Sequence, residues 1–150
     1  MRIGITLRTW LVLSIAAALC GCGSDERNSP TAAKLKALAN FYLDYAVAQP
    51  GHQGPANEQA FRKHIRSVPD FQLKANGLDP ATLDATFVSE RDQEPFVILY
   101  GSTISRISGD STQVIAHEKS GKNGKRLVVY ASAKVDLVDE AKLKELASKP

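Results

Sequence analysis

Few side chains in this 150-residue chain are placed to do chemistry. The three histidines, His52, His64 and His117, are far apart in the sequence, and none has a second histidine at helical spacing, so a zinc site has no local support. A Gly-x-Ser-x-Gly elbow, which would present a nucleophilic serine, is absent. A catalytic triad assembled from distant residues stays possible. The sequence therefore predicts no catalytic residue, no metal site and no cofactor.

The one site that suggests a phosphate-binding loop is Gly124-Lys125. Such a loop needs a glycine five residues earlier and a serine or threonine after the lysine. Lys119 and Arg126 occupy those two positions instead. A nucleotide-binding loop is excluded.

Acidic side chains are densest between residues 79 and 94. Carboxylates on a turn around Asp92 could hold calcium, although the Asp-x-Asp-x-Asp-Gly loop is missing. Because Arg91 lies among these acids, a solvated turn that pairs with itself is the simpler interpretation. The acidic residues are Asp79, Asp84, Glu90, Asp92 and Glu94.

Basic side chains gather at Lys119, Lys122, Lys125 and Arg126. On a protein held at a membrane, these four could rest on anionic headgroups or on a polyanionic envelope polymer, at about 1 kcal/mol per suitably placed cation. A hairpin tip that only keeps the protein soluble explains the same residues. They are the binding candidates that the sequence offers.

Both cysteines, Cys20 and Cys22, end an apolar run that follows a basic segment, which is typical of an export signal. The apolar run, residues 10–19, is too short to span a bilayer. The tetrad Leu19-Cys20-Gly21-Cys22 resembles the lipobox of bacterial lipoproteins. This resemblance implies cleavage before Cys22, acylation of Cys22, and a periplasm-facing or surface-exposed protein. Gly23 in place of an aspartate favours the outer membrane over the inner one.

Three segments follow: a signal peptide at 1–21, a lipidated tether at 22–30, and a single domain at 31–150. The eight residues 23–30 would reach at most roughly 26 Å. Removal of the signal takes away Arg2 and Arg8, so 17 basic side chains face 16 acidic ones and the net charge falls from +3 to +1. This balance argues against a nucleic-acid partner. The mature domain has no cysteine pair for a disulfide.

Two other interpretations of the N-terminal segment stay open. One is an ordinary signal peptide with an unmodified cysteine. The other rests on Gly4-Ile5-Thr6-Leu7, which resembles the opening of prepilins. That family expects a glutamate at the position of Thr9, and Arg8 interrupts the apolar helix.

Helical periodicity begins after Pro30. Apolar residues at steps of three and four predict an amphipathic helix of about 18 residues, which Pro50-Gly51 ends. A second helix is expected from Asn57, as the N-cap, to about Ser67, with its basic side chains outward. The first apolar stripe contains Leu35, Leu38, Phe41, Tyr42, Tyr45 and Val47, and the second contains Phe61, Ile65 and Val68.

The apolar pattern shortens after an irregular stretch at 71–84, in which Gly77 closes one turn. We expect an antiparallel meander of three to four strands with a glycine-rich turn at 120–124, then a short helix capped by Asp139. The fold class is α+β. The candidate strands are residues 86–88, 96–100, 112–117, 126–131 and 134–138.

Two segments, Arg91 to Gly101 and Val114 to Ala131, resemble the pilin-like domain of type II secretion pseudopilins, although Ser132-Ala133 stands where that family has Asp-Gly. The chain also resembles short exported bacterial proteins with no assigned activity. The sequence predicts a membrane-anchored envelope lipoprotein that acts as a non-catalytic binding or assembly module, with an envelope or secretion-system protein as partner. A minor pseudopilin, or a small envelope enzyme or ligand-binding protein, are the alternatives.

Overall fold

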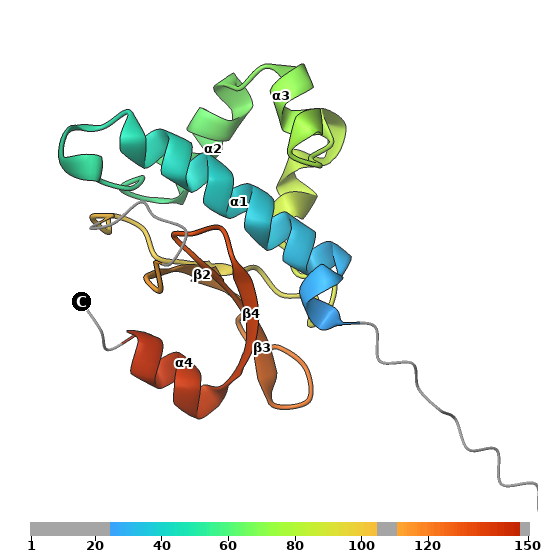
Figure 1. The fold of residues 1–150 in the computed structure, drawn as a ribbon. Helices are drawn as coiled ribbons and strands as arrows, with labels where there is room; N and C mark the ends of the chain where they lie inside the picture. Colours follow the sequence, from blue (N-terminus) through green and yellow to red (C-terminus); the bar gives the residue numbers. More distant parts are fainter. Residues whose placement is uncertain (1–24, 105–110, 148–150) are drawn as a thin grey trace, which may run out of the picture.

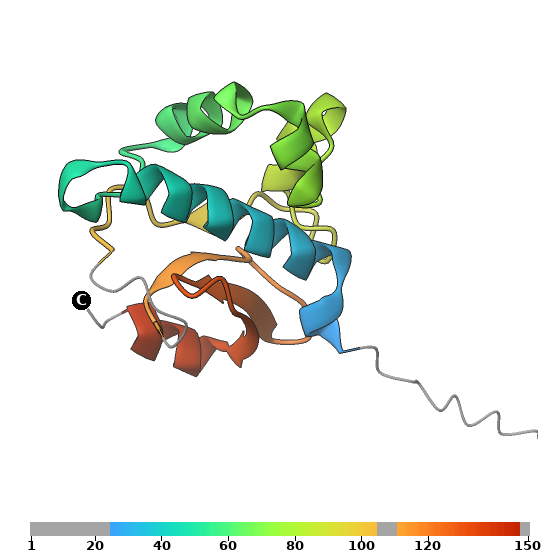
Figure 2. The same ribbon diagram turned by 45° about the horizontal axis from the view of Figure 1, so that its top comes forward.

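The computed structural model describes residues 25–104 and 111–147, so Cys22 and the signal segment lie outside the described residues. In it, helices cover both faces of a four-stranded antiparallel sheet (Figure 1). Helix α1 crosses one face, and helix α4 lies on the other (Figure 2). The predicted α+β class is confirmed. No helix in the described part of the chain combines the length and apolar character that a membrane span requires.

Helix α1, Pro30–Val47, has the 18 residues that the sequence predicted. It begins sharply because Ser29 Oγ accepts a hydrogen bond from the Ala32 N–H at 3.2 Å and Pro30 suits the first turn. The predicted apolar stripe is buried at Leu35, Leu38, Phe41 and Tyr42. Tyr45 is half-buried, and the expected burial of Val47 is wrong, since this residue is 55% exposed. A 3-10 turn, η1 (Glu26–Asn28), leads into the helix.

Helix α2, Glu58–Ser67, packs on α1 and starts as predicted, because Asn57 Oδ1 accepts from the Ala60 N–H at 2.9 Å. Its Phe61 ring lies edge-on to Tyr42, with the centroids 5.7 Å apart. A short 3-10 turn, η2 (Pro50–His52), connects the two helices. The predicted inward face of α2 is confirmed at Phe61 and Ile65.

The segment expected to be irregular contains two further elements, α3 (Asp70–Ala75) and the 3-10 segment η3 (Pro80–Phe87). Gly77, at φ 77°, closes the turn between them as predicted. The strand expected at 86–88 is wrong. Asp79 caps the Ala81 N–H at 3.0 Å at the start of η3, and at its end the Phe87 ring packs edge-on against Phe61 of α2, with the centroids 5.9 Å apart. Val88 makes only an isolated bridge.

The sheet is a meander in the order β1-β2-β3-β4. The last three strands lie within two residues of their predicted bounds, whereas β1 is shorter than expected. It ends early because the Tyr42 hydroxyl donates to the Leu99 carbonyl at 2.7 Å and the Tyr100 N–H turns back to Ile98. The strands are β1 (Val97–Ile98), β2 (Val114–His117), β3 (Lys125–Tyr130) and β4 (Val135–Asp139). The turn before β3 has the predicted positive φ angles at Gly121, Asn123 and Gly124.

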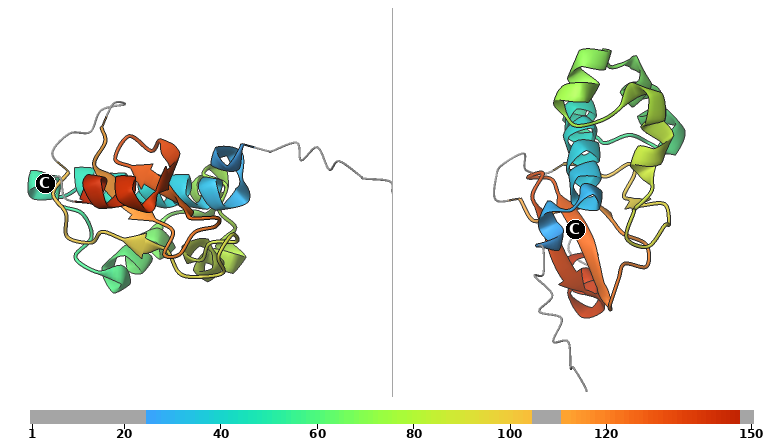
Figure 3. Two further views of the ribbon diagram at one scale, coloured as in Figure 1. Left: turned by 90° about the horizontal axis from the view of Figure 1, so that it is seen from below. Right: turned by 90° about the vertical axis from the view of Figure 1, so that its right-hand side faces the viewer.

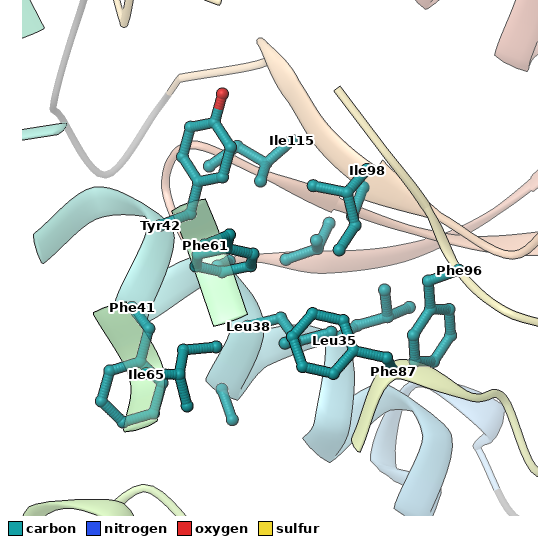
Figure 4. Packing of buried hydrophobic residues seen from close by; sticks show 14 of the residues in the cluster. Leu35, Leu38, Phe41, Tyr42, Phe61, Ile65, Phe87, Phe96, Ile98 and Ile115 are labelled. Atoms are coloured by element: carbon teal, nitrogen blue, oxygen red, sulfur yellow. The ribbon is translucent and has the colours of Figure 1, made fainter. Parts of the chain in front are cut away.

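Strand β3 is buried on both faces, and its side chains alternate between two apolar clusters. Leu127 and Val129 join the cluster beneath α1, part of which is drawn in Figure 4. Val128 and Tyr130 point to the other face and join Leu143 and Leu146 of helix α4 (Glu140–Ala147). Asp139 caps α4 as predicted, since its Oδ1 accepts from the Lys142 N–H at 2.8 Å.

Strand β4 forms one edge of the sheet. Near its middle, the Leu137 N–H donates to the carboxylate of the neighbouring Asp136 at 3.0 Å. Arg27 of η1 lies 3.8 Å from the same carboxylate oxygen. Side chains of the protein itself therefore occupy this part of the edge.

The close approach of Gly54 to Tyr42 gives a stability test. A Cβ at residue 54 would lie 2.0 Å from the Tyr42 hydroxyl oxygen, so Gly54→Ala should lower the free energy of unfolding by about 3 kcal/mol. Gly51→Ala is the control: it meets no atom within 4 Å and carries only the strain of φ +70°, about 1 kcal/mol. Urea denaturation of both variants measures the difference, and equal losses would contradict the packing at Gly54.

Candidate functional site

Glu118, directly after β2, is a fully buried carboxylate. Its Oε1 accepts from the Ser89 hydroxyl at 2.8 Å. Its Oε2 accepts from the Leu127 N–H at 2.8 Å and forms an ion pair with Arg91. A buried charge is tolerated only when it is paired and hydrogen-bonded, and Glu118 meets both conditions.

Arg91 extends this pairing to the start of the domain. Its second guanidinium nitrogen pairs with Glu26 of η1, and only 9% of the arginine side chain is exposed. The next residue back, Glu90, donates its N–H to Thr31 Oγ1 at 3.1 Å. We call Glu26, Arg91 and Glu118 the ion-pair chain. It joins η1, the turn at 89–94 and the β2–β3 hairpin.

The ion-pair chain reaches into the segment that the sequence assigned to a lipidated tether at 22–30. Asp25 caps η1 by accepting from the Arg27 N–H at 3.2 Å, and Glu26 is held by Arg91. The folded domain thus includes residues from Asp25 onward. Sequence reasoning missed the chain because it placed Arg91 among the acids of its own turn, whereas the partners are 65 and 27 residues away.

Asp92 joins the same turn to the hairpin. One carboxylate oxygen accepts from the N–H groups of Ser120, at 3.0 Å, and Gly121, at 2.7 Å, and the other accepts from Glu94 N–H at 3.2 Å. Burial opposes ionisation, but these donors outweigh it, and the pKa of Asp92 lies below its usual value. Within the described ranges, no three Asp, Glu, His or Cys residues are grouped to hold a metal ion.

Two of the four basic candidates are paired with acids. Lys119 pairs with Glu94 at 2.7 Å, and Arg126 pairs with Glu140 of α4 at 2.7 Å. Lys122 and Lys125 are exposed at the hairpin tip, and neither forms an ion pair with another described residue. Half of the predicted patch thus has acidic partners among the described residues.

The histidines lie in three separate elements. His64 is edge-on to Tyr45, with the ring centroids 5.3 Å apart, and burial lowers the pKa of His64. His117 Nδ1 lies 2.7 Å from the carbonyl oxygen of Glu118, and burial lowers the pKa of His117 as well. His52 is exposed in η2. The structure does not bring these rings together.

The described surface has open hollows, and no histidine lines the two that follow. The first, the α2 hollow, has a volume of about 690 Å³ and is lined by Glu58, Gln59, Arg62, Lys63, Arg66 and Ser67. The second, of about 440 Å³, lies between the start of α1 and the β3–β4 turn. Its charged lining residues are Arg27, Lys36 and Lys134.

Large apolar side chains are exposed at two places in the described residues. Val47 ends α1, and Phe71, which is 70% exposed, begins α3. They belong to different helices, and no other described large apolar side chain is exposed beside them on either helix. The surface features that remain are charged.

Searches of family models, curated proteins and solved structures found no match to this chain.

The buried ion pair predicts a large loss of stability on Glu118→Gln. Breaking a buried pair costs about 3–5 kcal/mol, and here it leaves Arg91 with only the more exposed Glu26 as an acidic partner. Glu94→Gln removes an acid from a more exposed ion pair in the same region and should cost far less. Thermal and urea unfolding measure both variants. Equal losses in the two variants would show that the burial of Glu118 has been misjudged.

Asp92 predicts a pH dependence. Since its folded pKa lies below the usual value, its contribution to stability is present above about pH 4 and is lost as the pH falls through the folded pKa. Asp92→Asn should therefore cost about 1 kcal/mol at pH 7, allowing for solvent screening, and progressively less below pH 4. Urea titrations from pH 7 to pH 2.5 test this, with Asp44→Asn on α1 as the control. A difference in unfolding free energy between the wild type and Asp92→Asn that stays constant from pH 7 to pH 2.5 would refute this prediction.

Proposed function

We propose that this protein is an envelope lipoprotein, anchored through a lipid on Cys22, whose domain is a non-catalytic binding or assembly module. The observation that carries the proposal is the position of the ion-pair chain. It holds the domain from Asp25 onward, three residues after Cys22. Three extended residues reach about 10 Å, so a lipid on Cys22 would keep the domain at the membrane surface.

A fixed start to the domain also gives the anchored protein an orientation. Glu26 is attached to Arg91, and η1 contacts both α1 and β4. The start of α1 would then face the bilayer, while the C-terminal half of α1 and the packed α2 would point away from it. A module that presents one surface outward suits binding to a partner in the envelope.

The surroundings of Glu118 support binding over catalysis. A general acid or base must exchange protons with a substrate. Glu118 has no exposed surface, and both of its oxygens accept hydrogen bonds from the protein. His64 and His117 lie outside the two hollows. The groups most able to transfer protons are thus arranged as structural groups.

The start of α1 favours the lipoprotein over a minor pseudopilin. A pilin-like subunit needs its apolar N-terminal helix to continue into the first helix of the domain. Here Ser29 is extended, at φ −72° and ψ 162°, and Pro30 follows it. The helix therefore begins at Pro30, after a separate 3-10 turn.

The anchor is tested by expressing the full chain in a bacterium with labelled palmitate and determining the mature N-terminus by mass spectrometry. We expect label on the wild type, cleavage before residue 22, and loss of both in Cys22→Ala. Cys20→Ala is the matched control, since it keeps a small residue before the cleavage site, and it should be labelled like the wild type. Cleavage after Gly4, or an unmodified Cys22 thiol in a water-soluble product, would rule the proposal out.

A further inference from the structure

The α2 hollow is lined by more bases than acids. Arg62, Lys63 and Arg66 supply three positive charges, and Glu58 is the one acid in its lining. Its volume is about 690 Å³, it is open to solvent, and all its lining residues come from α2. The hollow therefore favours an anionic ligand.

Two arginines of this hollow converge on one oxygen of Asp84 in η3. Arg62 Nη1 lies 2.7 Å and Arg66 Nη2 lies 3.0 Å from Asp84 Oδ1. The Asp84 side chain is 75% exposed, and an exposed ion pair contributes little net stability. A carboxylate from another molecule can thus replace Asp84 at little cost. Asp84 also indicates the ligand chemistry, which is a carboxylate held between two guanidinium groups.

Arg62 is already fixed in the geometry that such a ligand needs. Its guanidinium lies 3.8 Å above the centroid of the Phe87 ring, and its Nε donates to Glu58 at 2.6 Å. Lys63 is exposed and forms no ion pair with another described residue. An arginine that is already held in place lowers the ordering cost of binding, and Lys63 adds a positive charge beside it.

The length of the hollow suits an extended peptide. Its lining runs from Glu58 to Ser67, which on a helix spans about 14 Å. An extended segment of four residues covers the same length, at about 3.3 Å per residue. Carboxylates two residues apart on that segment would be separated by about 7 Å, close to the spacing of about 6 Å between helix positions 62 and 66.

The hollow is also placed where a partner can reach it. Helix α2 packs on the C-terminal half of α1, through Tyr42–Phe61 and Tyr45–His64 ring contacts, whereas η1 precedes the opposite end. Figure 3 shows α2 and α3 on the side of α1 that faces away from the sheet. A bound segment would not meet the start of the domain.

From these observations we propose that the α2 hollow binds a carboxylate-rich peptide segment of a partner protein, which displaces Asp84 from Arg62 and Arg66. This inference names a partner chemistry and does not depend on lipidation.

The test is fluorescence anisotropy of labelled hexaglutamate with the full chain purified in detergent. Lys63→Ala/Arg66→Ala should weaken binding at least tenfold, because two charge-assisted contacts are lost. Asp84→Asn should tighten binding about threefold, because the internal competitor is removed. The matched controls are Lys122→Ala/Lys125→Ala, which removes two cations from the hairpin tip, and Glu145→Gln, which removes one acid from α4. Both should bind like the wild type.

Equal weakening by the two double variants would overturn the proposal, because it would show attraction to net charge alone. The proposal would also be overturned if Glu145→Gln and Asp84→Asn bound hexaglutamate more tightly by the same factor. Inorganic phosphate that displaces the peptide at matched charge concentration would replace the peptide assignment with a simple anion site. Circular dichroism checks the fold of each variant. If Lys63→Ala/Arg66→Ala is unfolded, the affinity of Asp84→Asn for hexaglutamate tests the proposal instead. An affinity equal to that of the wild type would then overturn it.

Discussion

The pairing of Arg91 with the buried Glu118 is the constraint on which the arrangement of this domain depends. A carboxylate removed from water needs hydrogen-bond donors around it. The donors to Glu118 are a guanidinium, a hydroxyl and a backbone N–H. These donors belong to the turn at 89–94 and to β3. One side chain thus holds the turn against the hairpin, and the same arginine reaches Glu26 at the start of the domain.

The two apolar clusters explain why a sheet of this size can be stable without a disulfide in the described residues. Strand β3 lies between α1 and α4, so every residue from Leu127 to Tyr130 is buried against one helix or the other. A strand buried on both faces appears in the sequence as a continuous apolar run. The ion-pair chain lies beside this core and fixes the connections that the apolar residues alone leave free.

Helices α1 and α2 could be predicted because periodicity and local caps, Ser29 and Asn57, determine where they begin. The meander could be predicted because its turns carry glycine and asparagine where φ is positive. The short β1 and the 3-10 segment η3 could not be predicted, because they depend on contacts with residues distant in the sequence. The Tyr42 hydroxyl, 57 residues away, donates a hydrogen bond to the Leu99 carbonyl, and the strand pattern ends there.

The same distinction applies to the candidate sites. Four basic residues close together in sequence suggested one patch, but Glu94 and Glu140 arrive from other elements and neutralise two of them. Conversely, the sequence predicted that Arg62 and Arg66 lie on the solvated face of a helix. Only the fold brings Asp84 between them. Their spacing of four residues, with Glu58 one turn earlier, was the single local signal of a preformed pair.

Strand β4 has a consequence for how copies of the protein meet. Free edge strands are where identical chains join into continuous sheets and begin to aggregate. Near the middle of this edge, the N–H of Leu137 is already bonded to Asp136, whose negative charge would also repel the same aspartate on a second copy. Many molecules crowded together would therefore resist fibril growth through this strand.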